Sequence, residues 1–288
     1  MLGARPRTLP AAVVPVVVGT ACAYEGGPRP DVVRFLLALV VAVSLQVATN
    51  YANDYSDGKR GTDDPSKRVG PPRLVGNGLA SPREVKLAML VAFGVAAAAG
   101  IELTILVGPE LLPVGAVSVL AGWFYTGGRH PYGYAGLGEA FVFTFFGLVA
   151  TVGSTYVQLE RITGLSVAMG VCVGALATAI LVVNNLRDIP GDTRSGKRTL
   201  AVRLGDQRTR RLYVGLMVFP YLALPLIAGL SGRPVASLAL ASIILATPNV
   251  TTVLRGATGQ GLIPVLGGTG RAQLAFGLLV SVGLVIIP

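Results

Sequence analysis

The chain has 288 residues, of which 52% are hydrophobic and only 13% are charged, and its formal net charge at pH 7 is +10. This composition is too apolar for an ordinary soluble domain, and it favours a protein that crosses a membrane several times. The basic excess does not call for nucleic acid as a partner, because Lys and Arg between apolar segments are explained by membrane orientation and by anionic lipid headgroups.

Nine apolar segments are each long enough to cross a bilayer, which takes about 17 to 25 helical residues. We therefore predict an all-α polytopic membrane protein that forms one integral-membrane domain over residues 1–288. In chain order, the predicted spans cover roughly residues 8–26, 34–53, 84–107, 111–127, 136–157, 163–186, 210–230, 234–253 and 270–288.

The basic residues predict how these spans are oriented. When the N-terminus is placed in the cytoplasm, 20 of the 24 Lys and Arg residues lie on the cytoplasmic side, as the preference of cytoplasmic loops for basic residues requires. The C-terminus is then outside. Two long basic loops, at about residues 54–83 and 188–209, follow the second and sixth spans into the cytoplasm.

Two motifs at the ends of the second and sixth spans hold four of the chain's 14 acidic residues. Each motif repeats Asn-x-x-x-Asp, and on a helix this spacing places the amide and the carboxylate one turn apart on the same face. The motifs read Asn50-Tyr-Ala-Asn53-Asp54-Tyr-Ser-Asp57 and Asn184-Asn185-Leu-Arg-Asp188-Ile-Pro-Gly-Asp192. Their matched positions indicate one shared site.

Carboxylates without His or Cys favour Mg²⁺ or Ca²⁺ over zinc, and Mg²⁺ commonly shares a substrate phosphate with one or two carboxylates. Four carboxylates and a diphosphate carry a charge of about −7, which a partly buried site cannot hold uncompensated. Two Mg²⁺ ions and the neighbouring basic residues would balance this charge. The motifs therefore predict a site for a metal-bound diphosphate at the cytoplasmic face.

Aromatic residues near the motifs suggest what the diphosphate is attached to. If it leaves an allylic lipid, the remaining fragment is a delocalised carbocation, which aromatic faces stabilise. The aromatic residues on the cytoplasmic halves of the second, fourth and fifth spans are Tyr51, Tyr55, Trp123, Phe124, Tyr125, Tyr132, Tyr134, Phe141, Phe145 and Phe146.

These motifs resemble those of the UbiA superfamily of intramembrane prenyltransferases, and the resemblance extends over essentially the whole chain. It implies nine transmembrane helices and two Mg²⁺ ions bound by Asp54, Asp57, Asp188 and Asp192. It also implies substrate-binding roles for Asn50, Asn53, Arg68, Arg73, Tyr125, Arg129, Asn184, Asn185, Lys197 and Arg198. The superfamily's first motif places a third Asp where this chain has Gly61, and Asp63 or Asp64 is the alternative ligand.

Glu139 lies near the cytoplasmic start of the fifth span, where an unpaired carboxylate is costly and is therefore a candidate for function. As a substrate-binding residue it would orient an aromatic acceptor or assist its deprotonation. A hydrogen bond between two helices is the alternative role for this side chain.

The strings Asn-Tyr-Ala-Asn-Asp-Tyr-Ser-Asp-Gly and Tyr-Thr-Gly-Gly-Arg-His-Pro-Tyr-Gly-Tyr most resemble the branch of the superfamily that prenylates 1,4-dihydroxy-2-naphthoate. This implies Mg²⁺-dependent transfer of a polyprenyl group from polyprenyl diphosphate to that ring, with loss of CO₂ and diphosphate, to give a demethylmenaquinone. Transfer to a hydroxybenzoate, haem or glycerol phosphate remains an alternative. Cation transport is another, and it would place the acids near the middle of the membrane.

Overall fold

The computed structural model describes residues 2–24, 29–62 and 70–286, and all the regular structure within these ranges is helical. The α-helices are α1 (Pro10–Cys22), α2 (Val32–Arg60), α3 (Pro82–Leu106), α4 (Leu111–Phe124), α5 (Gly138–Val142), α6 (Ala150–Leu159), α7 (Gly164–Arg194), α8 (Leu200–Leu230), α9 (Ile243–Leu254) and α10 (Ile263–Ile286). The shorter elements are the 3₁₀ helices η1 (Leu2–Ala4), η2 (Pro6–Thr8), η3 (Tyr132–Ala135), η5 (Pro234–Ser242) and η6 (Gly259–Leu262), and the π-helix η4 (Phe143–Val149).

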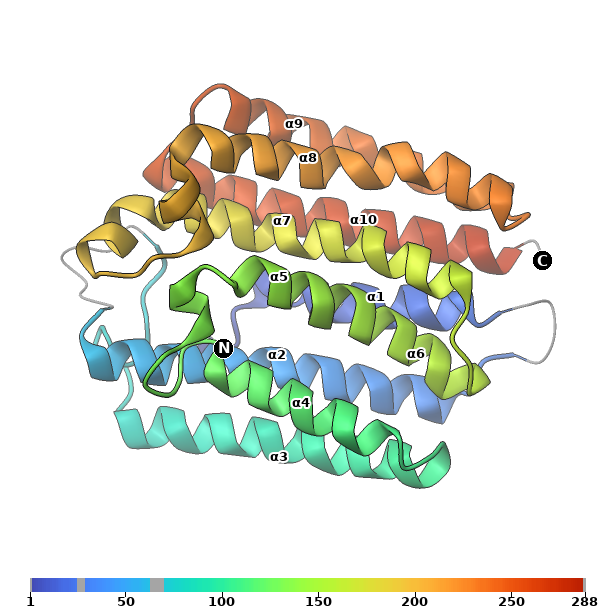
Figure 1. Ribbon diagram of the computed structural model, residues 1–288, viewed down its shortest axis with the longest axis horizontal. Helices are drawn as coiled ribbons and strands as arrows, with labels where there is room; N and C mark the ends of the chain where they lie inside the picture. The colour runs from blue at the N-terminus through green and yellow to red at the C-terminus, as the bar shows by residue number, and fades with distance from the viewer. Residues whose placement is uncertain (1, 25–28, 63–69, 287–288) are drawn as a thin grey trace.

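The helices lie side by side along the longest axis of the molecule (Figure 1). Helix α3 forms one edge of the bundle and packs on α2, while α8 packs on α7 towards the opposite edge. Helix α1 lies between these groups, in contact with α2, α6, α7 and α10. The polar ends of α2 and α7 therefore reach the same end of the bundle, at the left in Figure 1.

Within the described residues, seven helical segments are long and apolar enough to cross a membrane, which supports a multi-pass membrane protein. They are Val32–Arg60, Pro82–Leu106, Gly138–Leu159, Gly164–Arg194, Leu200–Leu230, Pro234–Leu254 and Gly259–Ile286. The first and fourth predicted spans correspond to shorter apolar helices, Pro6–Cys22 and Leu111–Phe124. At 1.5 Å per residue, the 14 residues of α4 extend about 21 Å, less than a hydrocarbon core of about 30 Å.

The predicted bounds of the two long loops, 54–83 and 188–209, were wrong: the first connection covers residues 61–81, and the second only residues 195–199. Helix α2 continues to Arg60 and α7 to Arg194, and α8 begins at Leu200 with an interruption at Gly205. The polar residues of the motifs lower the hydropathy there, but they are buried or half-buried against neighbouring segments and the helices continue through them. Helix α2 ends where Gly61 adopts a left-handed conformation, with φ 70°.

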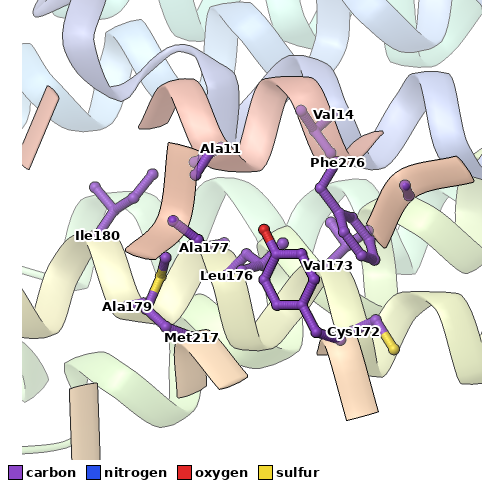
Figure 2. Close-up of a cluster of buried hydrophobic side chains, with 14 of the residues drawn as sticks. Ala11, Val14, Cys172, Val173, Leu176, Ala177, Ala179, Ile180, Met217 and Phe276 are labelled. Atoms are coloured by element: carbon purple, nitrogen blue, oxygen red, sulfur yellow. The ribbon is translucent and has the colours of Figure 1, made fainter. Parts of the chain in front are cut away.

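Helix α7 is the centre of the core, and 78% of its most apolar stretch is buried. Figure 2 shows Val14 of α1, Val173 of α7 and Phe276 of α10 in one cluster of buried side chains. The exposed apolar residues lie mainly on the outer helices, where lipid replaces protein contacts.

Glycines allow the segment η4 to approach α7 closely. A Cβ atom added at Gly147 would lie 2.4 Å from the Cα atom of Gly174. Small residues at such crossings are typical of helix packing in membranes. The crossing holds the π-helix against the central helix, and π-helical turns occur frequently at functional sites.

Candidate functional site

A cavity of about 1240 Å³ runs between α1, α2, α4, α7 and the segment from α5 to α6. One end is polar and contains all four aspartates of the two motifs: Asp54, Asp57, Asp188 and Asp192. The other end is lined by apolar side chains from the far ends of α3, α4 and α6, including Leu103, Leu111 and Val157. The cavity therefore offers a charged compartment that continues into an apolar one.

The two motifs reach this cavity because each lies on one face of a continuous helix. Asn50 and Asp54 line the cavity one turn apart on α2, and Asn184 and Asp188 do so on α7. Both motifs therefore face one cavity.

Asp54 is 2% exposed and is held by two arginines from different segments. Its Oδ1 atom lies 2.6 Å from Nη2 of Arg5 and 2.9 Å from Nη1 of Arg73. The backbone N–H of Leu74 donates to the other carboxylate oxygen at 3.3 Å. The segment before α1 and the segment after α2 thus converge on one carboxylate.

Asp57 joins the end of α2 to the connection between α7 and α8. Nζ of Lys197 lies 2.9 Å from Asp57 Oδ2, and the hydroxyl of Tyr134 donates to Oδ1. Burial opposes the charge of Lys197, but the carboxylate of Asp57 and the neighbouring Tyr134 raise the pKa of Lys197 to about 12. Burial and Asp57 also raise the pKa of Tyr134, so the phenol is a neutral donor at pH 7.

The second motif contains its own cation. Arg187 donates to both oxygens of Asp188, at 2.8 and 2.6 Å, and Nη2 also donates to Asn184 Oδ1 at 2.9 Å. The hydroxyl of Thr199 is 3.5 Å from Asp192 Oδ2. The carboxylates of this motif are less buried than Asp54 and Asp57.

The remaining motif amides tie the site to neighbouring segments. Asn50 Nδ2 donates to the carbonyl of Ala4 at 3.0 Å, and Asn53 Oδ1 accepts from the hydroxyl of Thr126 at 2.8 Å. Asn185 Nδ2 donates to Glu139 Oε1 at 2.9 Å. Glu139 is 6% exposed, and its side chain is absent from the described lining of the cavity. Its observed partner is therefore an amide on α7.

The four predicted substrate-binding cations that lie within the described ranges reach different places. Arg73 and Lys197 line the cavity, whereas Arg129 and Arg198 are exposed and lie outside its described lining. Helix α4 ends at Phe124 and the chain turns through Gly128, with φ 76°, so Arg129 does not continue the helical face of Tyr125. The backbone N–H of Arg198 donates to the carbonyl of Tyr134 at 3.0 Å.

Some predicted residues fall outside the described ranges, namely Arg68, Asp63 and Asp64. Tyr125 and all four motif asparagines line the cavity, as Arg73 and Lys197 do.

Arg5 and Arg187 line the cavity but were not assigned to the site from the sequence. Arg5 served only as a marker of orientation, although its position directly before Pro6 and an apolar segment restricts where its side chain can lie. Arg187 lies inside the second motif and was counted only as a basic loop residue. Their roles depend on contacts between distant segments, which spacing alone does not reveal.

Aromatic rings form one wall of the cavity next to the charged end. Tyr125 contacts Tyr132 edge-on at 5.5 Å between ring centroids, Tyr132 stacks on Phe141 at 3.9 Å, and Phe141 stacks on Phe145 at 5.9 Å. Of the other predicted aromatic residues, Tyr134 and Phe146 also line this cavity, whereas Tyr55 and Trp123 line a separate pocket.

The donor set at the polar end suits a hard divalent cation, because it consists of carboxylate and amide oxygens. Within the described ranges, His, Cys, Asp and Glu do not form a group of three poised to hold a metal. Three of the aspartates are instead paired with Arg or Lys. Binding of a cation would require these basic side chains to move from the carboxylates, which would leave them available to an anionic ligand.

Comparison with known proteins agrees with this geometry. Residues 12–260 match the UbiA prenyltransferase family. The 1,4-dihydroxy-2-naphthoate octaprenyltransferase of Mycobacterium tuberculosis is 49% identical over 280 residues, covering 97% of this chain and 94% of that protein. The enzyme of the same name from Escherichia coli is 39% identical over 220 residues, covering 74% and 71%.

The fold is also found in a solved structure. A UbiA homolog from Archaeoglobus fulgidus bound to DMAPP and Mg²⁺ superposes with a TM-score of 0.64 at 15% identity, covering 97% of this chain and 98% of that one.

Proposed function

Because this chain belongs to the UbiA prenyltransferase family, we propose that it transfers a polyprenyl group from polyprenyl diphosphate to 1,4-dihydroxy-2-naphthoate. One observation carries the proposal: both aspartate motifs lie at the charged end of a single cavity whose remainder is aromatic and apolar. The charged end suits a diphosphate and the apolar end suits an isoprenoid chain. The names of the mycobacterial and enterobacterial relatives support the naphthoate as acceptor.

The polar end supplies the groups that the leaving diphosphate needs. Asp54, Asp57, Asp188 and Asp192 would hold divalent metal, which the Archaeoglobus homolog bound to DMAPP and Mg²⁺ supports. The charge of the four carboxylates and a diphosphate leads us to propose two Mg²⁺ ions. When bound, the metal stabilises the negative charge that develops on the diphosphate.

The protein's own cations complete this charge balance. Arg5, Arg73 and Lys197 pair with Asp54 and Asp57. Their side chains are therefore within reach of a diphosphate bound between the two motifs, and the arginines can donate in bidentate fashion to its oxygens. Tyr134 stays neutral and orients Asp57 through its hydroxyl.

The aromatic wall has two functions in this proposal. Tyr125, Tyr132 and Phe141 present π faces and edges beside the charged end, where an allylic cation would form. The same rings exclude water, which would otherwise capture the cation.

The reaction balances without a base that removes a ring proton. The ring carbon that carries the carboxylate forms a bond to the first carbon of the prenyl group, whose bond to the diphosphate oxygen breaks. The bond to the carboxylate then breaks, CO₂ leaves, and its electron pair restores the aromatic ring. The product is the reduced demethylmenaquinone, and Glu139 need not act as a general base.

We further propose that all nine apolar helices cross the membrane, with the N-terminus and the active site on the cytoplasmic side. Helix α1 lies within the bundle, where neighbouring helices cover it, whereas α4 packs on α2 and α3 and leaves most of its apolar side chains exposed to lipid. The basic residues around the motifs support this orientation.

The proposal is tested by incubating the purified protein in detergent with Mg²⁺, a polyprenyl diphosphate and 1,4-dihydroxy-2-naphthoate, and by analysing the products by mass spectrometry. A prenylated, decarboxylated ring that forms only when all three components are present would support it. If folded protein gives this product with hydroxybenzoate and not with the naphthoate, the assigned acceptor is wrong.

A further inference from the structure

A second pocket, of about 760 Å³, lies between α2, α3 and α4. It is lined by residues of α2 that do not line the large cavity, such as Tyr55 and Lys59, while the aspartates of α2 line the large cavity instead. Arg60 is the residue of α2 that borders both spaces. Nothing in the proposed prenyl transfer uses this pocket.

The pocket has an aromatic floor and a cationic rim. Tyr55, Phe93 and Trp123 contribute rings from α2, α3 and α4. Lys59 and Lys86 are exposed at the rim, and Lys59 Nζ lies 5.5 Å from the centroid of the Tyr55 ring. Acidic side chains are absent from the described residues that line it. The rim therefore attracts anions.

The apolar side of the pocket faces the outside of the bundle. Leu90 and Leu120 border it and are 52% and 53% exposed, on helices whose outer faces are apolar. In a membrane these leucines contact acyl chains, whereas the amines of Lys59 and Lys86 extend towards the headgroups. A ligand that fits both parts has an anionic head and a hydrocarbon tail.

We propose that this pocket binds one anionic phospholipid, with the phosphate between Lys59, Lys86 and Arg60 and an acyl chain against Trp123 and Phe93. Anionic headgroups attract basic clusters at the membrane surface, and the rings add contacts that a diffuse ionic layer would lack. The prenyl diphosphate and the aromatic acceptor belong to the other cavity, because Asp54 and Asp57 line that cavity.

A lipid bound in this pocket would affect the large cavity through its contact with Arg60. Its guanidinium donates to the carbonyls of Thr126 and Gly128 and lies 5.3 Å from the centroid of the Tyr134 ring. Tyr134 in turn donates to Asp57. A phosphate that binds Arg60 would therefore change the position of Tyr134 and, through it, of Asp57. This effect on catalysis rests on the proposed function, whereas lipid binding does not.

Trp123 is the only tryptophan of the chain, so its fluorescence reports directly on this pocket. The protein is reconstituted in phosphatidylcholine vesicles that contain 20 mol% of a lipid with brominated acyl chains, which quench nearby tryptophan. We expect brominated phosphatidylglycerol to quench Trp123 at least about twofold more than brominated phosphatidylcholine at the same fraction. Equal quenching by the two lipids would overturn the proposal.

Two double variants that lose the same charge distinguish lipid binding in this pocket from a general attraction of anionic lipid to the basic surface. In Lys59→Gln/Lys86→Gln the preference for phosphatidylglycerol should disappear, whereas Arg255→Gln/Arg271→Gln, which changes exposed cations elsewhere, should keep it. A preference that survives the first pair of changes contradicts the proposed site. Loss of the preference on adding glycerol 1-phosphate equimolar to the lipid would assign the rim to a soluble phosphate instead.

A kinetic measurement separates this proposal from a site for the acceptor. In detergent without anionic lipid, Lys59→Gln/Lys86→Gln should leave KM for 1,4-dihydroxy-2-naphthoate within about twofold of the unmodified protein, and a tenfold rise would assign the pocket to the acceptor. In vesicles, phosphatidylglycerol should raise kcat of the unmodified protein and not of this variant. If neither protein is active, the proposed function fails while the fluorescence result still decides the lipid site.

Discussion

Arg5 and Asp54 form an ion pair across 49 positions of sequence, with 2.6 Å between Nη2 and Oδ1. The same guanidinium donates to the carbonyl of Asn50 at 3.2 Å, and Asn50 Nδ2 donates to the carbonyl of Ala4. Arg5 has a left-handed backbone, with φ 48°, which is unusual for a residue other than glycine. The segment before α1 is thus fixed to the first aspartate motif by several independent contacts.

Replacement of Arg5 tests whether this segment belongs to the active site. We expect Arg5→Gln to lower kcat/KM for the polyprenyl diphosphate by about 10- to 100-fold, because it removes a charge-assisted donor beside the diphosphate. Steady-state kinetics with varied prenyl diphosphate measure the effect. The matched control is Arg83→Gln, an exposed arginine in the first turn of α3. Equal kinetics for the two variants would remove Arg5 from the site.

The aspartates are expected to act as a pair of motifs. Asp54→Asn and Asp188→Asn should each reduce turnover by more than about 1,000-fold, because the shared charged end loses a carboxylate that metal and substrate require. Removal of Mg²⁺ with EDTA should abolish activity, and excess Mg²⁺ should restore it in the unmodified protein but not in the variants. Gel filtration and circular dichroism check the folding of each variant. Activity near normal in either folded variant contradicts the shared metal-diphosphate site.

Glu139 and Asn185 allow a positioning role to be separated from acid-base chemistry. Glu139→Gln can keep an oxygen acceptor for Asn185 Nδ2, whereas Glu139→Leu cannot. We therefore expect kcat for Glu139→Gln within about threefold of normal and a loss of tenfold or more for Glu139→Leu. If Glu139→Gln is as inactive as Glu139→Leu, the carboxylate takes part in the chemistry. The pH profile of kcat for Glu139→Gln gives an independent check, since a positioning role leaves it unchanged.

The crossing of η4 and α7 gives a prediction on stability. A Cβ atom at Gly147 would lie 2.4 Å from Gly174 Cα, a backbone atom that moves only with its helix. Gly147→Ala should therefore destabilise the protein by about 1–3 kcal/mol. The control is Gly229→Ala, because a Cβ at that helical position meets nothing within 4 Å. A thermal unfolding assay in detergent that shows equal midpoints for the two variants would contradict this packing.

The sequence predicted the helices better than their ends. Each predicted apolar run overlaps a helical segment of the described residues, seven of them long enough to cross a membrane and two shorter, because burial in lipid or protein requires hydrophobic residues whatever the tertiary structure. The ends at Arg60 and Arg194 were missed because the last turns of α2 and α7 are polar. Their side chains are satisfied by contacts from distant segments, as Asp57 is by Lys197, and hydropathy does not register such contacts.

The site was predictable to the extent that its residues share local spacing. Asn50 with Asp54 and Asn184 with Asp188 were found because four-residue spacing on a helix defines one face. The contacts of Arg5 with Asp54 and of Tyr134 with Asp57 were not found, because the partners lie 49 and 77 positions apart. The resemblance assigned both Tyr125 and Arg129 to the substrate, but only Tyr125 lines the cavity, because the chain turns through Gly128 after α4.

The central claim is that prenyl transfer replaces the carboxylate of the acceptor, and the ratio of the two leaving groups tests it most directly. The naphthoate labelled with ¹³C in its carboxyl group is incubated with polyprenyl diphosphate, Mg²⁺ and purified protein, and labelled CO₂ and diphosphate are measured in the same reaction. A one-to-one release that depends on both substrates is expected. Diphosphate released at the same rate without the naphthoate, or prenylated product that retains the label, would contradict this function.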